Sequence, residues 1–231
     1  LGTQAHIVVT TPEDKARRVI DRTRTMVSAR IERPAQRLRS IPNWQSVLTQ
    51  MEGSANVTAV SPTLSGSAFV LRGSAKQSVL LRGVDDSFNR IVPVAERLSA
   101  GRFDVSSGQV VIGTQLADDL GVELGDKVRL SVGNGSDGVF NVAGIFDLKN
   151  KTVNTQWVFV SLRTAQTMLD LAGGVTAIEL RVDEIFAANR IADRLARLTQ
   201  LHADSWMRTN KQLMIALQSQ EEIASAENRL A

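Results

Sequence analysis

Residues 110–130 carry the sequence VVIGTQLADDLGVELGDKVRL, in which two short apolar segments flank a small helical pattern. Val110–Ile112 consists of β-branched residues and is typical of a buried strand. Thr114–Leu120 predicts one or two helical turns that end at Gly121, because glycine readily adopts the left-handed conformation that closes a helix. Residues 128–132 alternate apolar and polar side chains, which favours a half-buried strand. This succession of small strands and a short helix indicates a compact α+β unit.

A glycine-rich segment follows, and its spacing is that of a dinucleotide-binding loop. Residues 133–138 have the sequence GNGSDG, which fits Gly-x-Gly-x-x-Gly. Such a loop needs a helix that begins at its third glycine, because the helix N-terminus holds the pyrophosphate. Here the alternating segment Phe140–Val142 follows instead. We therefore expect a β-hairpin turn, for which Gly and Asn supply the required backbone angles.

The segments before this unit predict a strand, a helix and a hairpin. His6–Thr10 is rich in β-branched residues and predicts a short strand. Asn43–Met51 predicts a helix, with Asn43 as its N-cap. Residues 57–71 and 77–81 are two extended segments joined by the turn at 73–76. These two segments are expected to pair as strands of an antiparallel hairpin or meander.

The clearest periodic patterns come late in the chain. Ile178–Val182 alternates strictly, which predicts a strand with the charges of Glu179 and Arg181 on its outer face. Asp183 is expected to cap the helix that follows, whose apolar side chains recur at helical spacing: Ala188, Ile191, Ala192, Leu195 and Leu198. A strand that leads into an amphipathic helix needs a sheet to pack against, and that sheet must come from earlier in the chain.

The composition excludes several classes of protein. The chain has 231 residues, 43% of them apolar, a formal charge of +3 and no cysteine. Disulfide frameworks, thiolate metal sites and cysteine nucleophiles are therefore excluded. The longest stretch without charged residues, 53–71, is broken by Pro62 and many small polar residues, so we do not expect it to cross a membrane. We also expect no signal peptide at the start of the sequence.

The positive charge is concentrated in one segment. Residues 15–39 contain nine basic and two acidic residues, a local charge of +7. Apolar residues fall near helical spacing there, so the segment predicts an amphipathic helix interrupted at Pro34. Three roles are open: a solvated helix, contact with anionic lipid head groups, or a nucleic-acid-binding arm. The candidates for contact with lipid or a partner are Arg17, Arg18, Arg22 and Arg24.

No pattern points to catalysis, a cofactor or a metal. The two histidines, His6 and His202, lie far apart in the sequence and neither has a second ligand at suitable spacing. Adjacent carboxylates such as Asp118-Asp119 point apart on a helix or strand. The sequence contains neither a Gly-x-Ser-x-Gly elbow nor a P-loop, and the serines at 61–67 lack a nearby base. We therefore predict a non-enzyme; the alternative of a small hydrolase would require a base beside a Ser or Asp.

The pattern at 113–126 resembles a known family. Such a strand, glycine, Leu-Ala-x-x-Leu-Gly helix and Gly-Asp turn is similar to the extracytoplasmic domain of ABC transporter permeases of the MacB, FtsX and LolC/LolE type. The matching residues are Gly113, Leu116, Ala117, Leu120, Gly121, Gly125 and Asp126. Further segments match in order: Phe140–Phe146, Trp157–Leu169, Ala177–Glu184 and Asp204–Asn210.

The resemblance implies a two-lobed α+β ectodomain. A porter-like lobe of mixed sheet and helices would comprise residues 1–101 with 163–231. A small Sabre-like α/β lobe would be inserted at 102–162. The sequence has no Pro or Gly from Trp206 to Ala231 and predicts a long helix there. In the family this segment enters a transmembrane helix, so we expect a stalk whose transmitting residues are Trp206, Asn210, Leu213 and Leu217.

The resemblance also implies a function and partners. The domain would lie in the periplasm, in a permease of the inner membrane, and would transmit ATP-driven conformational change for export or extraction of a lipid, lipoprotein or other substrate. Its partners would be a second permease chain and a cytoplasmic ATP-binding subunit, with a periplasmic adaptor as a further option. Transmembrane helices would connect it to the membrane. The resemblance implies no nucleic acid and no cofactor. The alternative is a soluble interaction or nucleic-acid-binding module that uses residues 15–39.

Overall fold

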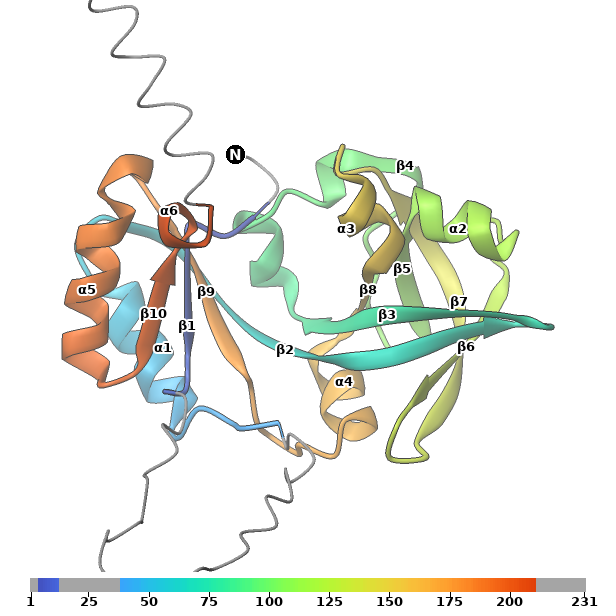
Figure 1. The fold of residues 1–231 in the computed structure, drawn as a ribbon, viewed down its shortest axis with the longest axis horizontal. Coiled ribbons are helices and arrows are strands. Elements are labelled where there is room, and N and C mark those ends of the chain that lie inside the picture. Colours follow the sequence, from blue (N-terminus) through green and yellow to red (C-terminus); the bar gives the residue numbers. More distant parts are fainter. Residues whose placement is uncertain (1–3, 13–37, 211–231) are drawn as a thin grey trace, which may run out of the picture.

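The computed structural model describes residues 4–12 and 38–210. Figure 1 shows two parts side by side, one built around a small sheet with α1 and α5 and the other around a larger set of strands. The strands are β1 (Ile7–Thr10), β2 (Val57–Arg72), β3 (Ala75–Val84), β4 (Leu98–Gly101), β5 (Gln109–Gly113), β6 (Lys127–Val132), β7 (Asp137–Phe146), β8 (Trp157–Ser161), β9 (Ala177–Val182) and β10 (His202–Ser205).

Short helices connect these strands. The α-helices are α1 (Trp44–Glu52), α2 (Thr114–Leu120), α3 (Lys151–Gln156), α4 (Leu162–Met168), α5 (Ala188–Thr199) and α6 (Trp206–Thr209). Three 3₁₀ turns accompany them: η1 (Asp86–Arg90), η2 (Ala95–Arg97) and η3 (Ile185–Ala187). The predicted α+β class is confirmed.

The small sheet has the strand order β10-β1-β9-β2, with antiparallel pairs throughout. One face of this sheet packs against α1 and α5. The amphipathic pattern of α5 supplies much of that core, as predicted, because Ala188, Ile191, Ala192 and Leu195 are buried. Leu198, which the same pattern placed in the core, is 52% exposed near the end of the helix.

Strand β2 joins the small sheet to a closed barrel. Residues 57–63 of β2 pair with β9, whereas residues 64–72 pair with β3 and residues 68–71 also pair with β6. Pro62 lies in the part of β2 that pairs along one edge only, a position that tolerates the missing N–H of proline. One continuous strand therefore belongs to both parts of the domain.

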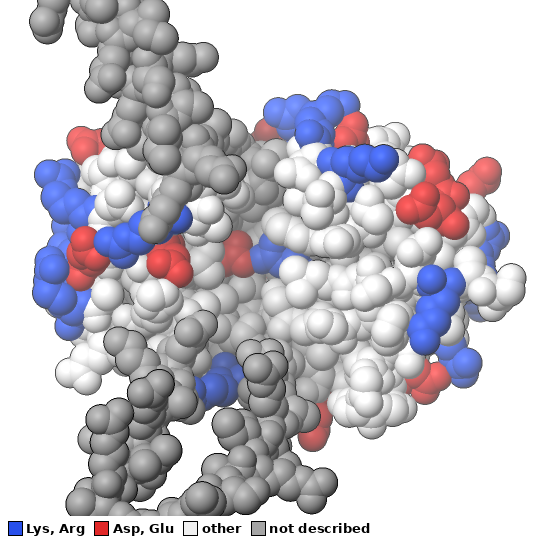
Figure 2. Space-filling model, in the orientation of Figure 1, with Lys and Arg blue, Asp and Glu red and all other residues white. Residues whose placement is uncertain are grey.

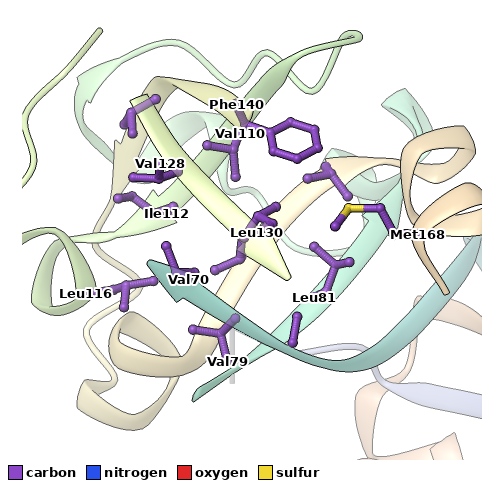
Figure 3. Packing of buried hydrophobic residues seen from close by; sticks show 14 of the residues in the cluster. Val70, Val79, Leu81, Val110, Ile112, Leu116, Val128, Leu130, Phe140 and Met168 are labelled. Atoms are coloured by element: carbon purple, nitrogen blue, oxygen red, sulfur yellow. The ribbon is translucent and has the colours of Figure 1, made fainter. Parts of the chain in front are cut away.

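The barrel closes through the order β2-β3-β8-β5-β7-β6 and back to β2. Its interior is apolar, and Figure 3 shows Val70, Leu81, Val110 and Leu130 projecting toward a common centre from different strands. Leu116 of α2 and Met168 of α4 join the same cluster. The barrel is thus a packed core rather than a channel.

Several local predictions are confirmed. Gly121 ends α2 with φ of 61°, in the left-handed region. The segment 133–138 forms the turn between β6 and β7, which pair antiparallel, so the Gly-x-Gly-x-x-Gly spacing belongs to a hairpin. The expected hairpin between residues 57–71 and 77–81 is β2–β3, joined through Gly73 and Ser74.

Two predictions, for Glu179 and Asp183, are wrong. Glu179 was expected on a solvated face, but it is only 6% exposed because the barrel covers that face of the sheet. Asn43 does occupy the N-cap position of α1, as predicted, although its backbone is left-handed and its side chain makes no capping hydrogen bond. Asp183 does not cap α5, because η3 intervenes and the N-cap position of α5 is Ala187.

The boundaries of the two lobes, 1–101 with 163–231 and 102–162, remain a prediction. Strands of the two predicted ranges pair with each other in two places. The β2–β3 hairpin falls within the first of these ranges, yet it pairs with β6 and β8, which fall within the second. Strand β4 ends at Gly101 and pairs with β7 of the inserted range.

Gly113 tests the close packing between β5 and α3. A Cβ added at Gly113 would lie 2.5 Å from the Cα of Asn154. Asn154 cannot withdraw, because its side chain accepts a hydrogen bond from Leu148 N and donates one to Asp147 Oδ1. We predict that Gly113→Ala lowers the free energy of unfolding by about 1–3 kcal/mol, measured by urea denaturation.

Gly133→Ala is the matched control, since an added Cβ there meets no atom within 4 Å and its φ is not positive. Equal stability of the two variants would contradict the packing described for β5 and α3.

Candidate functional site at the paired chain ends

The two ends of the described chain meet at one corner of the small sheet. Strands β1 and β10 pair antiparallel, so Ile7 lies opposite Ser205. The backbone N–H of Trp206 donates to the carbonyl of His6 at 2.9 Å. Figure 1 shows β1 beginning beside α6. His6 and Trp206 therefore lie side by side at this corner.

Trp206, predicted as a stalk residue, anchors this corner. Its side chain is 3% exposed, and its indole N–H donates to the carbonyl of Ile185 at 2.9 Å. The ring lies edge-on to Phe186, with 6.1 Å between ring centroids. Asn210, a second predicted stalk residue, donates to the carbonyl of Trp206 through its backbone N–H and its side-chain amide. The structure thus brings these two residues together.

Arg208 binds α6 to its neighbours, a role that the sequence did not indicate. One guanidinium nitrogen lies 2.6 Å from Asp193 Oδ1 on α5, and another donates to the carbonyl of Ala203 on β10. The buried Ser205 hydroxyl accepts from the backbone N–H of Arg208 and donates to Asn189. These partners are remote from α6 in sequence or belong to another element, so periodicity could not reveal them.

His6 is held at the start of β1 by the neighbouring strand. Its Nδ1 lies 3.2 Å from both the backbone nitrogen and the carbonyl oxygen of Val182, so it accepts from the N–H in one tautomer and donates to the carbonyl in the other. Burial lowers the pKa of His6 below 6.5, the contact with the Val182 backbone opposes this, and the charge of Arg181 lowers the pKa further.

A second set of contacts links the small sheet to the barrel. Arg82 of β3 and Glu179 of β9 form a buried ion pair. Thr63 of β2 donates to Glu179 Oε1 at 3.1 Å. The guanidinium carbon of Arg82 lies 4.2 Å from the ring centroid of Trp157 and 5.0 Å from that of Phe88. Sequence reasoning missed this pair, although it did place Glu179 on the face opposite Ile178.

The remaining predicted site residues lie outside the described ranges: Leu213 and Leu217 of the stalk, and Arg17, Arg18, Arg22 and Arg24 of the basic segment. Within residues 4–12 and 38–210, no three His, Asp or Glu side chains gather as metal ligands would. In the same ranges, no helix has the length and apolar character needed to cross a membrane.

Comparison with known proteins relates the chain to permeases. Residues 14–231 match the family described as the MacB-like periplasmic core domain. The LolE transmembrane protein of the Haemophilus influenzae lipoprotein-releasing system is 25% identical over 166 residues, 66% of this chain and 39% of that protein. The Neisseria meningitidis LolC protein is 25% identical over 153 residues, 61% of this chain and 37% of that protein. The chain thus spans less than two fifths of these relatives.

Two solved structures share the fold. The periplasmic region of MacB from Actinobacillus actinomycetemcomitans matches with a TM-score of 0.56 and 17% identity, over 93% of this chain and 94% of that one. The extracellular domain of the noncanonical ABC-type transporter YknZ from Gram-positive bacteria matches with a TM-score of 0.55 and 13% identity. That match covers 85% of this chain and 92% of the YknZ domain.

The pKa of His6 tests the packing at the chain ends. Because the folded-state pKa lies below 6.5, the unfolded chain binds more protons between the two values. The free energy of unfolding should therefore fall as the pH falls through this window, and the contribution of His6 should be complete above it. We predict a His6 pKa below 6.5 in an NMR titration.

The His6→Asn variant assigns the resonance, since the chain has two histidines and only one signal disappears. Asn also keeps an acceptor near Val182. A His6 pKa at or above 6.5 would contradict the burial described for this side chain.

Proposed function

This chain belongs to the family of MacB-like periplasmic core domains, and on that basis we propose that it transmits ATP-driven movements of a permease across the membrane during export or extraction of a substrate. The domain itself is the periplasmic part of an ABC permease of the MacB, LolC and LolE kind, anchored in the inner membrane. The family, the α+β fold and the periplasmic location predicted from the sequence are confirmed.

The neighbouring chain ends are the observation that carries this proposal. In this proposal, the connections to the rest of a permease run from the ends next to His6 and Asn210. The hydrogen bond between Trp206 N and His6 O joins these two ends of the domain. Since β1 and β10 are adjacent strands, displacement of either connection acts directly on the small sheet. Such a device requires that nucleotide states of the permease favour different arrangements of its membrane segments.

The contacts of α6 hold this helix against neighbouring elements, which favours the transmission of movement. Trp206 is buried against Ile185, and Arg208 is paired with Asp193 on α5. A turn fastened at several points passes on a displacement that a free loop would absorb. We infer that Trp206 and Asn210 are transmitting residues, and that Leu213 and Leu217 continue this role along the stalk.

The partners and substrate follow the same proposal. We infer a second permease chain and a cytoplasmic ATP-binding subunit, with a periplasmic adaptor as a further partner. The domain is then non-catalytic, because ATP hydrolysis belongs to the separate subunit. Two relatives are named as proteins of a lipoprotein-releasing system, which supports a lipid or lipoprotein as the substrate. Arg17, Arg18, Arg22 and Arg24 are the proposed contacts with lipid or a partner.

A proline in the predicted stalk tests the proposal. Leu213→Pro removes a backbone donor and costs a helix about 3 kcal/mol, so we expect ATP-driven transport to be lost. The measurement is substrate release by the full-length permease reconstituted in liposomes with its ATPase. Leu213→Ala, which keeps helical propensity, is the control and should retain transport. Undiminished transport by Leu213→Pro would refute the stalk as a transmitting element.

A further inference from the structure

The small sheet and the barrel meet face to face at a buried junction. The face of the small sheet opposite α1 and α5 contributes Ala59 and Val8, and the outer wall of the barrel contributes Val84, Val111 and Phe159. Phe159 is central, because its ring contacts those of Phe88, Phe103, Phe146 and Trp157. The junction is thus an apolar, aromatic layer between the two parts.

A single ion pair crosses this layer among the described residues. Arg82 projects outward from the barrel, since Val79 and Leu81 of the same strand face the barrel interior. Glu179 projects from β9 on the face opposite Ile178 and Leu180, which belong to the core beneath α5. The side chains of Arg82 and Glu179 are 6% and 8% exposed. The pair therefore joins the two parts away from water.

The surroundings of Arg82 fix its direction. Trp157, Phe88 and Phe159 lie around the guanidinium, and the planar fork suits both a carboxylate and an aromatic face. The Arg82 Nε atom is buried without a hydrogen-bond partner. In the described ranges, Glu179 is the carboxylate paired with this cation. The position thus tolerates the charge of Arg82 because Glu179 is present.

We propose that the Arg82–Glu179 pair is a clamp that sets the angle between the small sheet and the barrel. Rotation of one part against the other would separate two charges inside an apolar layer, which is strongly unfavourable unless both become hydrated. Strand β2 alone would allow bending, because it is a single strand shared by the two sheets. The clamp removes that freedom.

The clamp extends the proposed transmission of movement from the small sheet to the barrel, and this consequence rests on the proposed function. A displacement at His6 and Trp206 moves the small sheet, and the clamped barrel moves with it as part of one body. The motion is then delivered to the far side of the barrel, where α2 lies (Figure 1). The clamp itself can be tested without ATP or a transport assay.

Distance measurements between the two parts test the clamp. The chain has no native cysteine, so Arg197→Cys and Glu123→Cys place spin labels at two exposed positions. Figure 2 shows basic side chains along α5, which carries Arg197, and acidic ones near α2 at the opposite end of the molecule. We expect a narrow distribution of label-to-label distances in this chain, and a distribution roughly twice as wide with Arg82→Met, because an unpaired Glu179 weakens the junction.

Arg129→Met is the matched control. The Arg129–Asp137 pair joins β6 and β7 within the barrel and is exposed. Its loss should leave the distance distribution unchanged. Equal widening by Arg129→Met and Arg82→Met would overturn the clamp, as would a wide distribution without either substitution.

If Arg82→Met alone does not fold, the double variant Arg82→Met, Glu179→Met provides a second test of the clamp. It removes both charges together, so no buried charge is left unpaired. A folded double variant with a widened distribution supports the clamp. A folded double variant with the original narrow distribution overturns it, because apolar packing then suffices. Failure of the double variant to fold also overturns it, since the pair would serve folding rather than the inter-part angle.

Discussion

Strand β2 belongs to two sheets at once, and this shared membership constrains the rest of the domain. Its first half closes the small sheet against β9, and its second half forms part of the barrel wall with β3 and β6. Because side chains alternate along a strand, the register of β2 fixes which faces of the two parts can meet. The aromatic junction and the Arg82–Glu179 pair occupy the space where they do. The relative position of sheet and barrel follows from these contacts.

The position of His6 and Trp206 matters because of the same arrangement. His6 and Trp206 lie at one corner of the small sheet, next to β1 and β10, whereas most of the described chain between them builds the barrel and its helices. A movement that enters at the corner can therefore reach the barrel through β2, through the junction and through the segment that runs from α4 to β9. This arrangement supports the proposed transmission of displacement by a domain of the MacB-like family. The buried contacts of α6 fit that role.

Local patterns predicted much of the fold, and contacts distant in sequence account for what they missed. Gly121 and the 133–138 turn obey local backbone preferences, so the end of α2 and the β6–β7 hairpin were predictable. Alternation correctly placed Glu179 opposite Ile178, but it cannot tell what covers a face. Arg82 and Glu179 are 97 residues apart in sequence, so their pairing depends on the assembled barrel. At the candidate site, family resemblance identified Trp206 and Asn210, whereas Arg208 and His6 emerged only from their contacts.

The central claim is that the small sheet and the barrel move as one body when the chain ends move. It is tested most directly in the full-length permease with its ATPase, with labels at Arg197 and Glu123 in one copy only. The distance between these labels is measured without nucleotide and with bound ATP. We predict the same narrow distance distribution in both states. A distance between sheet and barrel that shifts with nucleotide would contradict it.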